Sequence, residues 1–167
     1  MNNTVIQIIA ATGSTFAFGI LYNLKGKKLI CAAIGGAIGW IVYIYLKGKG
    51  SSDPGAFLFA AMAITIYAEI IARILKTPVT STLIAALIPL VPGSGVYFTM
   101  SHFVQGETDL AIQKGIETIL ITVAITVGIV MISAFSEIYY KIKKYDLRKK
   151  ALLKKLELEK KIKKSES

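Results

Sequence analysis

The composition of this 167-residue chain excludes an ordinary water-soluble domain. Hydrophobic residues make up 54% of it, 14 further positions are glycine and only 18% are charged, against about 25% charged residues in typical soluble domains. Residues 1–136 carry 8 basic and 5 acidic side chains, whereas residues 137–167 carry 12 and 5. This excess of positive charge follows the last apolar run, which is typical of the cytoplasmic flank of a membrane protein, so we expect no nucleic-acid partner.

The apolar segments predict an all-α integral membrane protein with five transmembrane helices. Four stretches are close to or above the roughly 20 residues that a spanning helix needs, over residues 4–24, 29–46, 54–75 and 110–135. A further segment, residues 77–106, has no Asp, Glu, Lys or Arg but is interrupted by prolines and glycines. Residues 79–91 are only 13 residues long and span about 20 Å of a roughly 30 Å hydrocarbon core, so we expect the fourth helix to be broken inside the membrane.

The chain is expected to divide into a transmembrane domain, residues 1–136, and a basic tail, residues 137–167. The tail alternates lysine pairs with leucines and has neither Gly nor Pro. It is predicted to form a basic helix on anionic lipid or on a partner. A frayed, solvated helix is the alternative, because a single helix gains little stability without a packed face.

The loop charges predict the orientation. Lys and Arg are enriched in cytoplasmic loops, and five crossings place Lys25, Lys27, Lys28 and the tail on one side. We therefore expect a multi-pass protein of the plasma membrane with its N-terminus outside and its C-terminus in the cytoplasm. If the fourth segment were a re-entrant loop, there would be four crossings. The tail and the first lysine cluster would then lie on opposite sides of the membrane.

Local signals predict helix starts and a packing face. Asp53 before Pro54, and Thr77 before Pro78, resemble helix starts with a capping side chain followed by proline. Gly35 and Gly39 have GxxxG spacing, which lets a neighbouring helix approach closely. We expect this face to contribute to packing, including packing against another subunit.

Ionisable residues within apolar helices are costly and are candidates for function. Glu69 and Arg73 are four residues apart and can pair on one helix face, either on a transport path or as an anchor at the cytoplasmic end. Glu117, with Lys114 three residues before it, is a candidate proton or substrate site or an interfacial ion pair. His102 is more consistent with an interfacial residue than with a proton relay.

The strongest local feature is the segment Ile-Pro-Leu-Val-Pro-Gly-Ser-Gly-Val-Tyr, residues 88–97. Its two prolines remove backbone donors and free the carbonyls that they would have bonded, and its glycines allow turns that other residues resist. A helix that restarts near Ser94 would direct the N–H groups around Ser94 to Val96, and its positive dipole end, at a substrate carboxylate. A proline kink that only shapes packing is the alternative. The candidate residues are Pro89, Pro92, Gly93, Ser94, Gly95 and Tyr97.

The same segment resembles the threonine/serine exporter family, in particular its small membrane subunit, which is equivalent to the second half of the full-length exporters. Ala68-Glu-Ile-Ile-Ala-Arg73, Lys76-Thr-Pro78 and Ala17-Phe-Gly-Ile-Leu-Tyr-Asn23 carry the resemblance further, over about residues 5–135. The resemblance implies export of small amino or organic acids, such as threonine, serine or a dicarboxylate like succinate. It also implies a second, larger membrane subunit.

The leading hypothesis is therefore a subunit of a secondary exporter of small carboxylate-bearing solutes, in which protonation of an acid such as Glu117 couples export to the proton gradient. A homo-oligomer is the alternative assembly. A channel-like or structural subunit without its own transport activity is the second hypothesis. An enzyme built on Ser94 and His102 is the third, but the sequence has no nucleophile elbow, His-Glu-x-x-His motif or Walker A pattern. We expect no cofactor and no metal.

Overall fold

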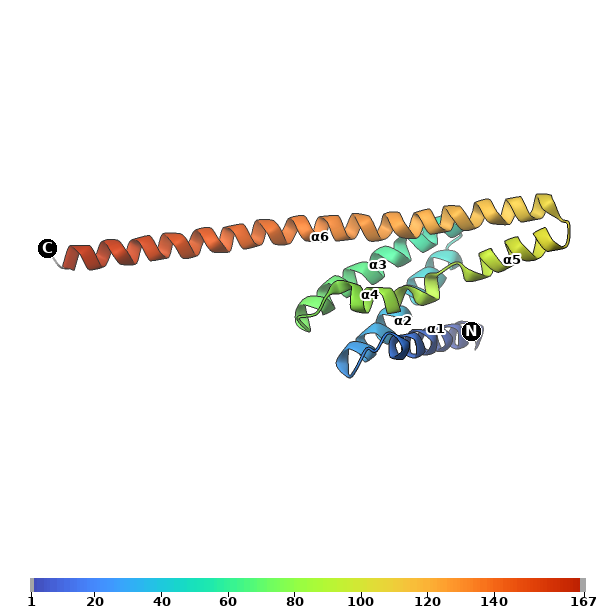
Figure 1. The fold of residues 1–167 in the computed structure, drawn as a ribbon, viewed down its shortest axis with the longest axis horizontal. Helices are drawn as coiled ribbons and strands as arrows, with labels where there is room; N and C mark the ends of the chain where they lie inside the picture. Colours follow the sequence, from blue (N-terminus) through green and yellow to red (C-terminus); the bar gives the residue numbers. More distant parts are fainter. Residues whose placement is uncertain (1, 166–167) are drawn as a thin grey trace. The chain divides into compact units, whose positions relative to one another are not determined.

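The computed structural model describes residues 2–165 and, in them, the side chains of residues 4–145, 148 and 149. All regular structure in residues 2–165 is helical, as expected (Figure 1). The chain divides into two units, Met1–Ser133 and Ala134–Ser167. The elements are α1 (Asn2–Leu21), α2 (Lys27–Gly48), α3 (Asp53–Ile74), α4 (Val79–Leu87), the 3₁₀ turn η1 (Ile88–Leu90), α5 (Gly93–Val104) and α6 (Thr108–Ser165).

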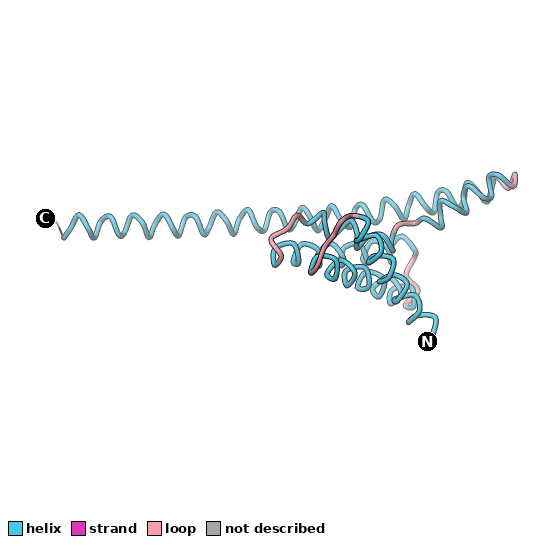
Figure 2. Tube along the Cα trace, turned by 60° about the horizontal axis from the view of Figure 1, so that its bottom comes forward, coloured by secondary structure: helices cyan, strands magenta, loops and turns pink. Residues whose placement is uncertain are grey.

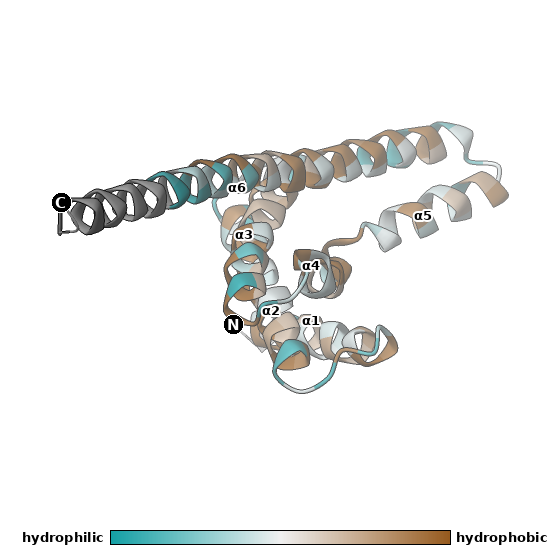
Figure 3. Ribbon diagram, turned by 60° about the vertical axis from the view of Figure 1, so that its left-hand side comes forward, coloured by the Kyte–Doolittle hydropathy of each residue, from teal (hydrophilic) through white to brown (hydrophobic). Residues whose placement is uncertain are grey.

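Several of these helices are suited to a membrane. In the described residues, α1, α2, α3 and the first part of α6 are each long and apolar enough to span one. The pair α4–η1 and α5 satisfies the same test jointly, with a bend of 46° between its halves. Large apolar side chains are exposed on α1, α5 and α6, for example Ile9, Phe103 and Ile119. Figure 3 shows apolar residues along each of these three helices. Such a surface is stable in lipid and not in water, so the protein is a multi-pass membrane protein.

The last helix is longer than the sequence predicted. We expected an apolar helix to end near Phe135 and a separate basic helix to follow, but α6 continues to Ser165. The chain has neither glycine nor proline after Gly128, so nothing in the local sequence ends the helix.

The core of the first unit is built from small residues. Ala60, Ala61, Ala68 and Ala86 are fully buried around Ile64 and Leu90. Small side chains let helix backbones approach closely, which is how membrane helices gain packing energy when lipid is as apolar as the core. A hydrogen bond from Tyr67 Oη to the Cys31 carbonyl, 3.0 Å long, joins α3 to α2.

Gly35 and Gly39 belong to this core. Both are buried, and a Cβ atom added to them would meet Ala86 and Tyr67 in the first case and Ile64 and Leu90 in the second. The GxxxG face of α2 therefore packs on α3, α4 and η1. The structure places it within the chain, where the sequence had suggested a surface for another subunit.

The break between α4 and α5 follows from Pro89 and Pro92 (Figure 2). The sequence predicted that the carbonyls these prolines cannot bond would be free. They are not, because the Ala85 carbonyl accepts from the Ile88 N–H and the Ile88 carbonyl accepts from the Val91 N–H. The chain tightens into a 3₁₀ turn, which satisfies each carbonyl one residue earlier than an α-helix would.

Two predicted helix caps were wrong. Helix α3 begins at Asp53 with Ser52 as its N-cap, and the Asp53 carboxylate pairs with Lys47 Nζ at 2.5 Å. Helix α4 begins at Val79 with Pro78 as its N-cap. The hydroxyl of Thr77, expected to be the cap, is buried without a partner in the described residues. In the first case Lys47, at the end of α2, pairs with the Asp53 carboxylate, which therefore does not cap the helix.

Candidate functional site

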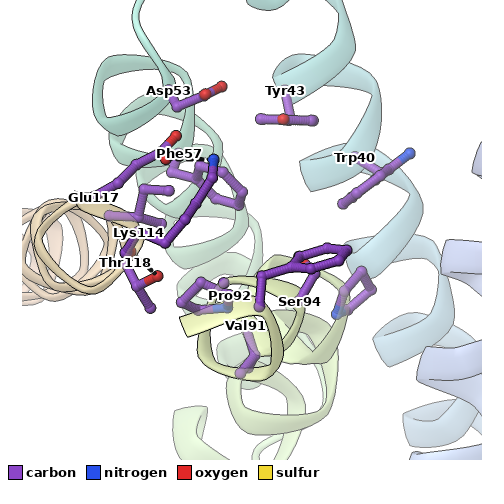
Figure 4. Close-up of a pocket in the computed structure, with 14 residues that line it drawn as sticks. Trp40, Tyr43, Asp53, Phe57, Val91, Pro92, Ser94, Lys114, Glu117 and Thr118 are labelled. Carbon is purple, nitrogen blue, oxygen red and sulfur yellow. Dashed lines mark hydrogen bonds and ion pairs between the residues drawn. The ribbon is translucent and has the colours of Figure 1, made fainter. Parts of the chain in front are cut away.

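A cavity of about 310 Å³ lies beside the helix break, in the first unit. It is a size that accommodates a small ligand. Helices α2, α3, α5 and α6 and the turn η1 contribute to its walls (Figure 4). The lining residues are Trp40, Tyr43, Asp53, Phe57, Pro89, Val91, Pro92, Ser94, Gly95, Phe98, Lys114, Glu117, Thr118 and Ile121.

Charges of both signs line this cavity. Asp53 comes from the start of α3, and Lys114 and Glu117 come from the second and third turns of α6. Lys114 Nζ and Glu117 Oε2 form an ion pair of 2.8 Å, and Asp53 is paired with Lys47. Figure 4 shows the three charged lining residues on one side and Tyr43 and Trp40 of α2 on the other. The cavity can thus meet both a cationic and an anionic group of a ligand.

The start of α5 adds backbone donors to the wall. A helix leaves its first N–H groups without intrahelical partners. Here the Gly93 N–H donates to the Val91 carbonyl and the Val96 N–H to the Pro92 carbonyl. For the N–H groups of Ser94 and Gly95 the described residues provide no acceptor. The sequence had proposed donors from Ser94 to Val96, and the structure removes Val96 from that set.

The two glycines of the break differ from their predicted role. Neither Gly93 nor Gly95 has a positive φ, so neither is needed for a left-handed turn. A Cβ atom on Gly95 would overlap the Thr118 hydroxyl, whereas one on Gly93 would have no neighbour within 4 Å in the described residues. Gly95 therefore serves the close approach of α5 to α6, and that approach brings Ser94 and Thr118 to the same cavity.

An aromatic row runs along the cavity wall from α2 to α3. The rings of Trp40 and Tyr43 have centroids 5.1 Å apart, and those of Tyr43 and Phe57 are 4.6 Å apart. Aromatic faces attract cations within about 6 Å of the ring centroid. The row therefore offers a second kind of surface for a positively charged group.

The structure brings together some of the predicted site residues and not others. Pro89, Pro92, Ser94, Gly95 and Glu117 line the cavity. Gly93 is exposed beside it.

Four further predicted residues lie away from the cavity. Glu69 and Arg73 form the expected pair, at 2.6 Å, but they lie near the far end of α3, 16 residues or about 24 Å from Asp53. Tyr97 is 68% exposed and does not line the cavity. His102 pairs with Glu107 at 2.5 Å and is eight residues, about 12 Å along α5, from Ser94, which separates the two as a catalytic dyad.

Sequence reasoning missed most of the cavity wall. Trp40, Tyr43 and Phe57 looked like ordinary membrane-helix residues, and Asp53 was interpreted only as a helix cap. The one available signal was that Asp53 is an acid at the end of an apolar helix, on the same predicted side of the membrane as Lys114 and Glu117. From this shared side, the sequence alone could have predicted that the three residues lie close together.

A bundle of apolar helices with a charged cavity beside a broken helix is an arrangement found in membrane transport proteins. The family described as Threonine/Serine exporter, ThrE, matches residues 7–135, which include every residue that lines the cavity. The chain therefore belongs to the threonine/serine exporter family, whose activity is the export of these amino acids across the membrane. Comparison with curated proteins and comparison with solved structures each gave no match.

Proposed function

We propose that the protein binds threonine and serine as zwitterions in the cavity between α2, α3, α5 and α6. The observation that carries the proposal is the presence of charges of both signs around one small space. The substrate carboxylate would accept hydrogen bonds from the Ser94 and Gly95 N–H groups and from Lys114. The substrate ammonium would pair with Asp53 or Glu117 next to the aromatic row.

The same charges disfavour a dicarboxylate. Succinate would bring two negative charges to a cavity whose wall already holds the carboxylates of Asp53 and Glu117. Like charges at short range repel, and this repulsion is stronger where water is scarce. A zwitterion adds no net charge and can exchange partners with the existing Lys114–Glu117 ion pair. The cavity therefore favours an amino acid over the organic acids that the sequence left open.

The single tryptophan of the chain provides a direct test, because Trp40 lines the cavity. Titration of the purified protein with threonine or serine should change the tryptophan fluorescence in a saturable manner. Succinate at equal concentration and ionic strength should leave it unchanged. Saturation by succinate, or no response to either amino acid, would contradict the proposal.

Glu117 is the proposed coupling acid. It lines the cavity and is bonded to Lys114, so a change in its protonation changes the charge that a substrate meets. Loss of the ion pair on protonation would free Lys114 for the substrate carboxylate. A channel-like protein, the alternative, would carry threonine at a rate independent of an imposed proton gradient.

We also propose five crossings with the N-terminus outside and the C-terminus in the cytoplasm. This topology treats α4, η1 and α5 as one broken span and keeps the lysines between α1 and α2 on the same side as the tail. Reporter fusions after Lys150 and between Lys47 and Asp53 should report opposite sides of the membrane. Two reporters on the same side would require four crossings.

The chain is proposed to act with a larger membrane subunit, and a homo-oligomer is the alternative. Helix α5, all of which is described, has no buried residue, and its side chains Phe103 and Val104 are 65% and 83% exposed. A helix with so little packing is suited to contact another protein. The mass of the complex extracted from native membranes would distinguish multiples of the 18.1 kDa chain from a complex with a different subunit.

A further inference from the structure

A second cavity lies next to the charged one and is open to the surface, where its lining residues Gln7 and Ala10 are exposed. It has a volume of about 300 Å³ and is lined by residues of α1, α2 and η1. Its polar groups are neutral, the amide of Gln7 and the hydroxyl of Ser14. The lining residues are Gln7, Ala10, Ala11, Ser14, Trp40 and Pro89.

Two residues line both cavities, and they are Trp40 and Pro89. A side chain that faces two cavities is part of the wall between them. The indole of Trp40 and the ring of Pro89 therefore separate the charged cavity from the neutral one. Removal of the larger of these two rings would connect the two cavities.

The indole is held in a way that is compatible with movement. The indole packs against the edge of the buried core, and the neighbouring ring of Tyr43 is tilted against it by 39°. Its Nε1 atom is buried without a hydrogen-bond acceptor in the described residues. A buried donor without an acceptor is unfavourable, so this conformation gains no hydrogen bond that a rotation would have to break. In Figure 4 the Nε1 atom points away from the charged residues.

Pro89, the other residue of the wall, lies at the break between α4 and α5. Pro89 belongs to the 3₁₀ turn between two helices bent by 46°. Changes in helix direction concentrate at such breaks, because few residues need to change their backbone angles. The wall between the cavities therefore consists of Trp40, whose indole N–H has no acceptor in the described residues, and Pro89, which lies at a potential hinge.

We propose that Trp40 is a gate between two substrate subsites, with the amino acid passing from the charged cavity to the neutral one. This inference rests on the proposed function. The neutral cavity suits transit, since the Gln7 amide and the indole N–H can donate to a carboxylate without a charge that would hold the substrate. The Ser14 hydroxyl donates to the Ala11 carbonyl, and its oxygen can still accept from a substrate hydroxyl. When the ring rotates, its N–H can bond the passing substrate.

Cysteine accessibility tests the gate. The native Cys31 is replaced by alanine, and Ser94→Cys or Ser14→Cys then introduces a single thiol, called the charged-cavity thiol and the neutral-cavity thiol respectively. A small membrane-impermeant methanethiosulfonate reagent is applied to vesicles of each orientation. From the side on which the charged-cavity thiol reacts, the neutral-cavity thiol should react slowly while Trp40 is present. Trp40→Ala should accelerate its modification by about tenfold or more, because the open form of a two-state element is typically populated at about 0.1–10%.

The controls separate a gate from a general loosening. Trp40→Phe, which keeps a ring, should leave the neutral-cavity thiol close to its original rate. Ile41→Ala, on the same helix but outside both cavities, should have no effect. Equal rates for the neutral-cavity thiol with and without the indole, or acceleration by Ile41→Ala, would overturn the gate.

The same preparation distinguishes failure of the gate from failure of the proposed function. Threonine should slow the modification of the charged-cavity thiol in the protein with Trp40 intact, because it occupies that cavity. Protection by threonine without any effect of Trp40→Ala on the neutral-cavity thiol would reject the gate and keep the substrate site. Absence of protection would reject the substrate site, and with it the passage that the gate controls.

Discussion

Replacement of Gly95 by valine should abolish threonine export, whereas Gly93→Ala should leave export close to that of the unmodified protein. The two glycines are two residues apart, yet only Gly95 lies against Thr118 of α6. Forcing a larger residue into a packed contact typically costs about 1–3 kcal/mol. Here it would also push α5 and its free N–H groups away from the cavity. Threonine efflux from cells that carry each variant at the native gene measures the effect.

A compensating change tests the reason for this difference. Gly95→Ala alone should reduce efflux, and Thr118→Ala added to it should restore part of the loss, because it removes the hydroxyl and methyl groups that the new Cβ would meet. Membrane levels of each variant, measured by immunoblot, provide the control. Equal losses in Gly93→Ala and Gly95→Val would show instead that the segment needs glycine for its backbone.

Neutralising Asp53 and Glu117, the two acids of the cavity, should have the second large effect. The first change should weaken threonine binding, and the second should remove the dependence of efflux on the proton gradient. Asp53→Asn should weaken threonine binding by roughly ten- to hundredfold, the range for a hydrogen bond to a charged group. Glu117→Gln should make efflux insensitive to an imposed proton gradient, because the amide cannot take up a proton. Binding is measured by Trp40 fluorescence and efflux in vesicles with a pH step.

Glu107→Gln is the matched control for both acids. Glu107 is an acid near the same end of α6, pairs with His102 and does not line the cavity. Its neutralisation should change neither threonine binding nor the response to the proton gradient. An effect as large as that of Asp53→Asn would indicate that overall surface charge, and not the cavity, attracts the substrate. Retention of proton sensitivity in Glu117→Gln would assign coupling to another group.

The local sequence determined much of the helical architecture. Runs of apolar residues define the helices because backbone groups in lipid must bond within their own segment, and the observed bounds of α2 and α3 lie within two residues of the predicted ones. Pro89 and Pro92 predicted the break in the same way, since a proline cannot donate the bond that an α-helix needs at that position. The spacing of Glu69 and Arg73 likewise predicted their pair.

Tertiary structure decided which of these features meet. Gly95 and Thr118, or Trp40 and Pro89, are far apart in sequence, and no local rule indicates that they are in contact or share a wall. The same holds for Asp53, whose carboxylate was available to cap α3 until folding placed it beside Lys47 and the cavity. Proline can predict that a helix breaks, but the neighbouring helices determine what the break faces. Contacts between distant segments depend on the packing of whole helices, so only the folded chain could identify this cavity and the indole that separates it from the next.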